Sequence, residues 1–256
     1  MSAPALVEVI RAPMLAGVAH GFLGRIGGVS TGVHAGLNVG IGSDDDAAAV
    51  IENRARAVAA VQPGARLLSP YQVHSADCVT VATPFADDAR PHADALVTDR
   101  PGLALGIVTA DCAPVLLADV QAGVIGAAHA GWKGALGGVT DATIQAMVAL
   151  GAQRDRIAAA IGPCIARASY EVDAGFADRF AADDPANERF FAEGRAGHFQ
   201  FDLEAYVAHR IAAAGVTRVA MLGLDTYGDE ARFFSFRRAT HRGEPGYGRQ
   251  ISIIGL

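Results

Sequence analysis

The stretch that decides the fold covers residues 102–133 and reads GLALGIVTADCAPVLLADVQAGVIGAAHAGWK. Nearly continuous apolar runs follow one another at 103–109, 115–118 and 124–129, which is typical of strands that are covered on both faces. A reactive side chain stands at two of the strand ends, because Cys112 follows the first run and His129 closes the third. We therefore expect a buried sheet that presents a thiol and an imidazole at its strand ends.

The flanking segments predict a mixture of helices and further strands. Their apolar spacing and glycine or proline stops predict helices at 43–62, 136–150, 173–182 and 202–214. Short apolar runs predict strands at 78–81, 94–99, 156–161, 216–222, 232–236 and 250–254. The polar segment 183–200 is expected to be an excursion at the surface. Since no internal repeat or linker is visible, we expect residues 1–256 to form a single domain.

The composition excludes several classes of partner. Of the 256 residues, 51% are hydrophobic and 19% are charged, so the chain is expected to be compact. The formal charge of -6 provides no long-range attraction for nucleic acid or an anionic membrane. The longest apolar window, 102–118, is interrupted by Asp111 and Pro114 and is too short to cross a bilayer. We expect neither a nucleic acid nor a membrane as a partner.

Cysteine usage and the N-terminal sequence predict a cytoplasmic protein. Three widely spaced cysteines argue against a disulfide scaffold and favour a reducing compartment. The opening sequence MSAPALVEVIRAPMLAG has no basic region before its short apolar stretch and contains Glu8 and Arg11, so it does not resemble a signal peptide.

Residues 19–40 form a glycine-rich stretch, AHGFLGRIGGVSTGVHAGLNVG, that contains Arg25 among seven glycines. Such a stretch exposes many backbone N–H groups and could surround an anion, but it lacks the spacing of a Walker or dinucleotide motif. Arg25 favours a loop that faces a ligand, and a plain surface loop is the alternative.

His74, Cys112 and His129 are the candidate metal ligands. Their separations of 38 and 17 residues differ from those of a structural zinc finger. Three ligands from separate strand ends would leave a coordination position open, as a catalytic zinc requires. Two alternatives remain at this point: Cys112 packs as a small hydrophobic residue, or it is a nucleophile with His129 as its base. The residue pattern alone does not separate these possibilities.

A series of motifs covers nearly the whole chain. They are GRIGGVSTGVHAGLNVG (24–40), QVHSA (72–76), DALVTDRPGLALGIVTADCAPVLLAD (94–119), GAAHAGWKG (126–134), AIGPCI (160–165) with YEV (170–172), and FFSFRR (233–238) with GRQIS (248–252). In this order they resemble the YfiH/FAMIN family, which was first described as laccase-like polyphenol oxidases and later as zinc-dependent purine nucleoside phosphorylases.

The resemblance implies both a fold and an activity. The implied fold is α+β, a four-layer α/β/β/α arrangement with mixed β-sheets that is shared with a group of cysteine hydrolases. The implied zinc ligands are His74, Cys112 and His129. The implied reaction is phosphorolysis of adenosine, inosine, guanosine or methylthioadenosine to a free base and ribose-1-phosphate, with adenosine deamination as a further activity. A Cys–His hydrolase that acts on an amide, such as a peptidoglycan precursor, is the alternative function.

An oxidase and a non-catalytic metal-binding module are less favoured. Multicopper centres commonly use His-x-His pairs, and none of the eight histidines forms such a pair. One cysteine and two histidines could hold a single copper ion but not a trinuclear cluster. Zinc is therefore the expected cofactor, with copper as the less favoured metal.

Phosphorolysis requires an anion site, so the cations inside the motifs are candidates for phosphate binding. We expect Arg25, Lys133, Arg237 and Arg238 to lie around the phosphate, with arginine as the better fork for its oxygens. A solvated surface charge is the alternative for each of them.

Other residues are expected to act on the nucleoside. Gln72 and Tyr71 are candidates for contacting it, and Trp132 or Phe22 could stack on a purine, although core packing is the commoner role of such aromatic residues. Asp111 is expected to join Cys112 and His129 in catalysis, either as a proton carrier or as an acceptor for a ligating histidine. Its alternative role is to cap a turn.

Overall fold

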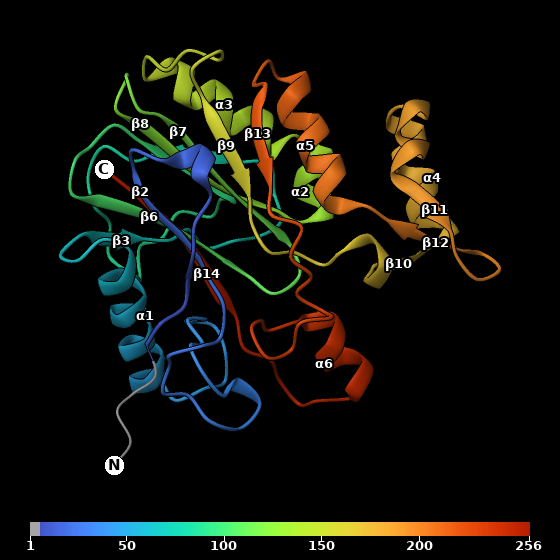
Figure 1. Cartoon of the computed structure of the whole chain (residues 1–256), viewed down its shortest axis with the longest axis horizontal. Coiled ribbons are helices and arrows are strands. Elements are labelled where there is room, and N and C mark those ends of the chain that lie inside the picture. The colour runs from blue at the N-terminus through green and yellow to red at the C-terminus, as the bar shows by residue number, and fades with distance from the viewer. Residues whose placement is uncertain (1–5) are drawn as a thin grey trace.

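Two β-sheets pack face to face in the computed structural model, which describes residues 6–256 (Figure 1). The five-stranded sheet has the order β1 (Val9–Ile10), β2 (Ala19–Leu23), β14 (Gln250–Gly255), β6 (Leu103–Thr109) and β3 (Arg66–Leu68). The six-stranded sheet has the order β13 (Arg218–Met221), β9 (Ala158–Ile161), β7 (Ala113–Asp119), β8 (Val124–Ala130), β5 (Ala95–Thr98) and β4 (Cys78–Thr80). Both sheets are mixed, because each combines parallel and antiparallel pairs.

Helices cover the outer face of each sheet. Helix α1 (Ala47–Val61) lies on the five-stranded sheet, and α3 (Val139–Ala149) and α5 (Leu203–Ala213) lie on the six-stranded sheet. This arrangement confirms the expected four-layer α/β/β/α fold. The short helix α2 (Trp132–Gly137) follows β8, and α6 (Phe236–Arg242) precedes β14.

A smaller unit extends from the side of the molecule beside α5 (Figure 1). It consists of α4 (Ala174–Asp183) and a three-stranded sheet of β10 (Glu171–Asp173), β12 (His198–Phe201) and β11 (Phe191–Glu193). Short 3₁₀-helices occur at Pro13–Leu15, Gly32–His34, Arg167–Ser169 and Pro185–Phe190.

The alternation of side chains along β6 shows why the layers form. Leu105 and Ile107 join the core between the two sheets, whereas Ala104 and Val108 face the core beneath α1. Because neighbouring side chains in a strand point to opposite faces, an apolar strand fills both cores at once. The continuous apolar run 103–109 therefore identified a strand with helix on one side and sheet on the other.

Two helix predictions need adjustment at glycine or a cap. The predicted helix 43–62 begins at Ala47, because the Asp46 side chain accepts hydrogen bonds from the backbone N–H groups of Ala48 and Ala49. The helix predicted over 136–150 is confirmed as α3 from Val139 onward, but its first residues belong to α2, since Gly138 has a left-handed φ of 95° and separates the two helices.

The strand predicted at 232–236 is also wrong. Phe233 and Phe234 are buried, but no strand within residues 6–256 pairs with them. Instead, the side-chain amide of Gln250 accepts from Phe234 N at 2.8 Å and donates to Phe234 O at 3.2 Å. The side-chain amide of Gln250 thus takes the place of a neighbouring strand and satisfies the backbone N–H and C=O of Phe234 without strand pairing.

Residues 183–200 lie mostly at the surface, as expected, but they also contribute β11 and most of β12. Phe180, Phe191 and Phe201 pack together there, with ring centroids 4.7–5.5 Å apart. The glycine-rich stretch likewise begins with a strand that the sequence did not reveal, β2.

Among the helices of residues 6–256, none combines the length and the apolar character needed to cross a bilayer. The signal-peptide prediction concerns the N-terminal stretch, whose residues 1–5 lie outside the described residues.

Candidate metal centre

Three segments bring His74, Cys112 and His129 together at one edge of the fold. His74 lies in the connection from β3 to β4, Cys112 in the connection from β6 to β7, and His129 within β8. One nitrogen or sulfur atom from each lies within 4.8 Å of the others. The Cys112 Sγ is 3.9 Å from His74 Nε2, and the two imidazole centroids are 4.8 Å apart. Among residues 6–256 this is the one group of three or more such side chains close enough to share a metal ion.

Asp94 fixes two of these ligands, and the sequence did not reveal its role. The side chain is fully buried just before β5, and its Oδ1 lies 2.7 Å from His129 Nδ1. Its Oδ2 accepts from the backbone N–H groups of Val73 at 3.0 Å and Ser75 at 2.7 Å, which flank His74. One carboxylate therefore orients His129 and holds the loop that carries His74. Such carboxylate–histidine pairs are typical of metal sites.

The Asp94 carboxylate is ionised at neutral pH. Burial by itself raises its pKa, but the hydrogen bond and charge of His129 and the N–H groups of Ser75 and Val73 lower the pKa to about 2. An acceptor at Nδ1 leaves the Nε2 of His129 free to face Cys112 as a ligand atom.

Cys112 and His129 shift each other's protonation. Burial raises the pKa of the Cys112 thiol, but the charge and hydrogen bonds of His129 and His74 reverse this and lower its pKa to about 6. Burial lowers the pKa of His129, but Cys112 and Asp94 outweigh it and raise the pKa to about 9. The thiolate form of Cys112, which is the form that binds metals and attacks carbon, is thus favoured.

Backbone geometry adapts to the cluster at two positions. His74 has a left-handed φ of 62°, which is uncommon for a residue other than glycine. At Gly131, a Cβ atom would lie 2.9 Å from Cys112 Sγ and 3.0 Å from His74 Cδ2. The site therefore requires glycine beside the two ligands. Two imidazoles and a thiolate in this arrangement suit zinc or a single copper ion.

Asp111 lies next to Cys112, outside the three-ligand cluster, and lines a cavity beside it. Its Oδ1 accepts from Thr226 Oγ1 at 2.7 Å, and its Oδ2 accepts from Ser235 Oγ at 3.0 Å and from Arg237 N at 2.7 Å. Burial raises its pKa despite these hydrogen bonds. Its φ of 86° is left-handed as well. Asp111 therefore connects the β6–β7 turn to the first turn of α6.

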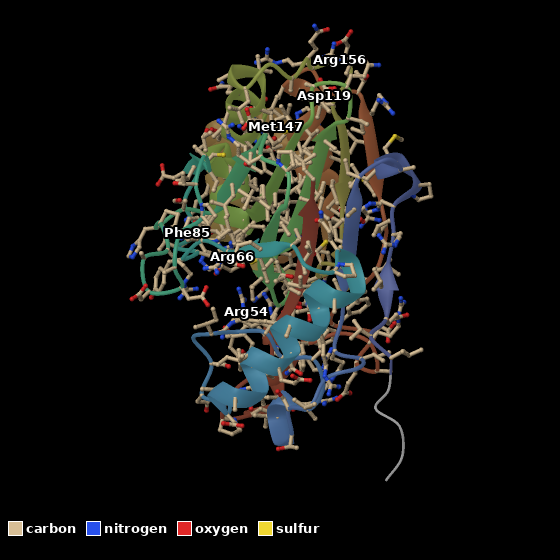
Figure 2. The ribbon with its side chains drawn as sticks, turned by 90° about the vertical axis from the view of Figure 1, so that its left-hand side faces the viewer. Arg54, Arg66, Phe85, Asp119, Met147 and Arg156 are labelled. Atoms are coloured by element: carbon tan, nitrogen blue, oxygen red, sulfur yellow. The ribbon has the colours of Figure 1, made fainter. Side chains whose placement is uncertain are left out.

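The ligand cluster separates two cavities that share His74, Ala110, Cys112 and Phe236. The first, of about 420 Å³, extends towards α1 and includes Tyr71, Tyr247 and three arginines, Arg54, Arg90 and Arg249. Figure 2 views the molecule from the side on which α1 and Arg54 face the viewer. The second, of about 330 Å³, extends towards the side unit and is lined by Trp132, Tyr170, Leu203, Lys133 and Arg237 among others. The centre is thus accessible from two compartments of different character.

The predicted substrate-binding residues do not all reach these cavities. Lys133 and Arg237 line the second cavity, and Arg237 also donates to Glu171 O at 2.8 Å. Gln72 lines the first cavity, but its amide pairs with Val108 N and O at 2.9 and 2.7 Å. Phe22 is buried between the two sheets.

Arg25 and Arg238 line a separate cavity together with Glu230 and Glu244. Arg238 is buried and donates to the carbonyls of Thr226, Tyr227 and Phe233 at 2.6–2.8 Å. Arg25 donates to Ala35 O at 3.0 and 3.2 Å. The structure therefore does not bring these two arginines to the ligand cluster.

Comparisons with known proteins show the family to which the chain belongs. A family described as "Multi-copper polyphenol oxidoreductase laccase" matches residues 19–256. A Deinococcus radiodurans protein named purine nucleoside phosphorylase is 43% identical over 257 residues, covering 100% of this chain and 95% of the relative. A Streptomyces griseus protein of the same name is 42% identical and covers 83% of this chain and 86% of the relative.

Solved structures show the same fold. The crystal structure of YlmD from Geobacillus stearothermophilus has a TM-score of 0.87 at 31% identity, covering 98% of this chain and 99% of that one. YfiH from Bacillus licheniformis has a TM-score of 0.86 at 28% identity, covering 99% and 97%.

Proposed function

The chain belongs to the YfiH family, whose members were described as polyphenol oxidoreductase laccases, and from this premise we propose that it is a zinc-dependent purine nucleoside phosphorylase. The relatives named purine nucleoside phosphorylase support the reaction class. The observation that carries the proposal is the His74–Cys112–His129 cluster, which lies between two cavities. A nucleoside phosphorylase needs both a place for a nucleoside and a place for phosphate beside one reactive centre.

The reaction breaks the bond between C1′ of the ribose and the purine nitrogen and forms a bond from C1′ to a phosphate oxygen. Positive charge develops on the sugar and negative charge on the departing base. The protein therefore has to orient an anion against C1′ and stabilise the base as it leaves. A zinc ion held by two imidazoles and one thiolate would keep an open coordination position and supply Lewis acidity.

The chain's own residues position these groups. Asp94 holds the tautomer of His129, so that its Nε2 faces the centre. We assign Lys133, Arg237 and Gln72 to the walls of the substrate site, and Trp132 and Tyr170 offer aromatic surface to a purine.

Asp111, which was expected to take part in catalysis, has a different proposed role. Both of its oxygens already accept hydrogen bonds. We propose that it acts as a positioning residue that holds the first turn of α6, and with it Arg237, beside Cys112. Asn in its place would keep the size of the side chain but add two donors that face Ser235 Oγ or Arg237 N.

Incubation with nucleosides tests the proposal. Metal-loaded protein with adenosine or inosine is expected to release the base and ribose-1-phosphate only when phosphate is present. Cys112→Ala should abolish the release, whereas Cys78→Ala, which removes a thiol from β4, should not. Base release that ignores phosphate, or that survives Cys112→Ala, would contradict the proposal. Formation of inosine from adenosine without phosphate would reveal the deamination that the family resemblance implies.

A thiol hydrolase is the second candidate, and the pKa values of Cys112 and His129 favour it in the metal-free protein. A thiolate beside an imidazolium is the arrangement of cysteine hydrolases, and an amide such as a peptidoglycan precursor is the expected substrate. This function predicts amide hydrolysis by metal-free protein, and its loss after one equivalent of an alkylating reagent. Added zinc should suppress hydrolysis in this case and promote phosphorolysis in the first.

A further inference from the structure

The first cavity is lined by three arginines, and its lining within residues 6–256 contains no acidic side chain. Within the described part of the chain, Arg54, Arg90 and Arg249 form no ion pair, and no Asp or Glu lines the cavity. The cavity with Arg25 and Arg238 also contains Glu230 and Glu244 and is therefore balanced. A concentration of positive charge in a chain of net charge -6 indicates a site for an anion.

Arg54 reaches this cavity from α1. Its guanidinium donates to Val39 O at 3.3 Å and to Ser69 Oγ at 3.2 Å, which fixes its plane. Burial lowers its pKa, the nearby charge of Asp87 raises it, and the charge of Arg90 lowers it. Two cations thus lie close enough to repel each other, and a dianion between them would relieve that repulsion.

Arg249 meets the same short segment, 38–40, from the other direction. Its N–H donates to Asn38 Oδ1 at 2.9 Å, and its carbonyl accepts from Val39 N at 3.0 Å. A Cβ on Gly40 would lie 3.0 Å from Nη1 of Arg249, so the guanidinium packs closely against the backbone of Gly40. The group also stacks on Tyr247, 4.7 Å from the ring centroid. Both arginines are therefore placed by one segment of the glycine-rich stretch.

Arg90 extends from the wall that carries Tyr71. Its Nε donates to Asp87 O at 2.9 Å, and its Cζ lies 5.5 Å from the Tyr71 ring centroid. Tyr71 in turn stacks on His92 at 4.6 Å. Tyr71 is followed closely in the chain by His74, so this wall leads directly to the metal ligands.

We propose that Arg54, Arg90 and Arg249 form the subsite for a phosphate dianion, on the α1 side of the His74–Cys112–His129 centre. Three planar guanidinium groups match the several acceptor oxygens of a phosphate better than they match the two oxygens of a carboxylate ligand. The opposite cavity, with Trp132 and Tyr170, then receives the purine. The proposal deepens the phosphorylase function and rests on it for the origin of the phosphate, whether inorganic or carried by the sugar product. In this proposal the three arginines hold the phosphate in place of the four cations expected from the sequence, which line other cavities: Lys133 and Arg237 on the purine side, and Arg25 and Arg238 beside Glu230.

Direct titration of the metal-loaded protein with inorganic phosphate, by calorimetry, tests the subsite without any turnover. Arg249→Gln and Arg90→Gln should each weaken phosphate binding by about 10- to 100-fold, as expected for loss of a charge-assisted contact. Arg56→Gln, which removes an arginine of α1 that pairs with Glu52 outside the cavity, is the matched control and should bind as wild type does. Arg54 is less suitable as the first variant, because it also holds Val39 and Ser69.

The competing location is the Lys133 side of the centre. Loss of phosphate binding in Lys133→Gln with wild-type binding in Arg249→Gln and Arg90→Gln would overturn the proposal, as would absence of phosphate binding to the wild type. Parallel titrations with ribose-1-phosphate and a nucleoside 5′-monophosphate distinguish the sources of the phosphate group. Ribose-1-phosphate should bind more tightly than the 5′-monophosphate, because the subsite is proposed to hold the phosphate that is joined to C1′. The reverse order would overturn this assignment.

Steady-state assays separate failure of the subsite from failure of the phosphorylase function. Arg249→Gln should raise the KM for phosphate and leave the KM for the nucleoside within about twofold. If the variants lose phosphate binding but no nucleoside is cleaved even by the wild type, the subsite stands and the phosphorylase function fails.

Discussion

Replacing Asp94 by Asn changes one atom and should remove most of the metal affinity of the centre. The two Asp94 oxygens face different partners: Oδ1 faces His129 Nδ1, and Oδ2 receives the backbone N–H groups of Val73 and Ser75. Asn has only one side-chain oxygen, and this oxygen has to stay where Oδ2 lies, because the N–H groups of Val73 and Ser75 need an acceptor there. The amide NH₂ then points at Nδ1 and donates to it, so that the proton of His129 moves to Nε2, the ligand atom.

The magnitude follows from the hydrogen bond that is lost. A hydrogen bond to a charged group contributes about 1.5–3 kcal/mol, which corresponds to a factor of about 10 to 150 in affinity. Substitutions of outer partners of ligating histidines cost about 10- to 100-fold. We therefore expect the Kd for zinc to rise by about 10- to 100-fold. Loss of the carboxylate also lowers the pKa of His129, which by itself would ease metal binding, so a weaker affinity isolates the tautomer effect.

Competition with a chromogenic chelator at about pH 7.5 measures this change in zinc affinity. A thermal melt of metal-free Asp94→Asn shows whether the variant is folded. Asp77→Asn is the matched control, because Asp77 is an exposed carboxylate three residues after His74 and outside the cluster. A zinc affinity of Asp94→Asn within twofold of the wild type, in folded protein, would refute the reasoning. It would mean that the tautomer of His129 is not fixed by Asp94.

Three further predictions concern the packing around the centre and the ion pair between buried Asp119 and partly exposed Arg156, at the end of the molecule far from α1 (Figure 2). Gly131→Ala should lower the zinc content, because the new Cβ would lie 2.9 Å from the Sγ of Cys112. Gly137→Ala, where the new Cβ would make only ordinary contacts, is the control and should keep the zinc content of the wild type. Equal zinc content of the two variants by elemental analysis would contradict this prediction. Asp119→Ala should cost about 3 kcal/mol in urea unfolding, since it leaves Arg156 and several backbone N–H groups without their buried acceptor; a loss below about 1 kcal/mol would argue against it. Burial raises the pKa of Asp119, but Arg156 and the backbone N–H groups lower it below the ordinary value of 3.8. The ionised carboxylate therefore stabilises the fold fully above that pH, and this stabilisation is lost as the pH falls through the folded-state pKa. The difference in melting temperature between the wild type and Asp119→Asn should shrink in acid and stay constant above about pH 5.

The layers of the fold could be predicted because their signal is local. The continuous apolar run that became β6 has the same bounds in the structure as in the sequence, since a strand covered on both faces needs no polar positions. The wrong strand at 232–236 also has bulky apolar residues, Phe233 and Phe234, but the backbone of Phe234 pairs with the distant side chain of Gln250. Gln72 likewise pairs with the backbone of Val108. No periodicity marks a side-chain amide that replaces a strand.

The centre could be predicted only in part. The three ligands were found because cysteine and histidine are few and because the motifs that carry them resemble a family. The cations were harder to place, since charge balance depends on residues far apart: Arg25 lies in one cavity with Glu230, about 200 positions later, whereas Arg54 forms no ion pair among residues 6–256. Arg54 lies within a predicted helix, where an arginine normally indicates a solvated face.

The two left-handed residues explain why the centre is held by buried carboxylates. His74 and Asp111 adopt a backbone conformation that glycine takes without strain and that costs other residues about 1–3 kcal/mol. Glycine cannot serve at either position, because one must supply an imidazole to the metal and the other a carboxylate to α6. The hydrogen bonds of Asp94 on both sides of His74 and those of Asp111 to Thr226 and Arg237 offset this cost. The strained residues and the hydrogen bonds that offset their strain therefore lie in the same two turns. Removal of the hydrogen bonds of Asp94 or of Asp111 should change the conformation of the turn that carries His74 or Cys112 before it disturbs the sheets.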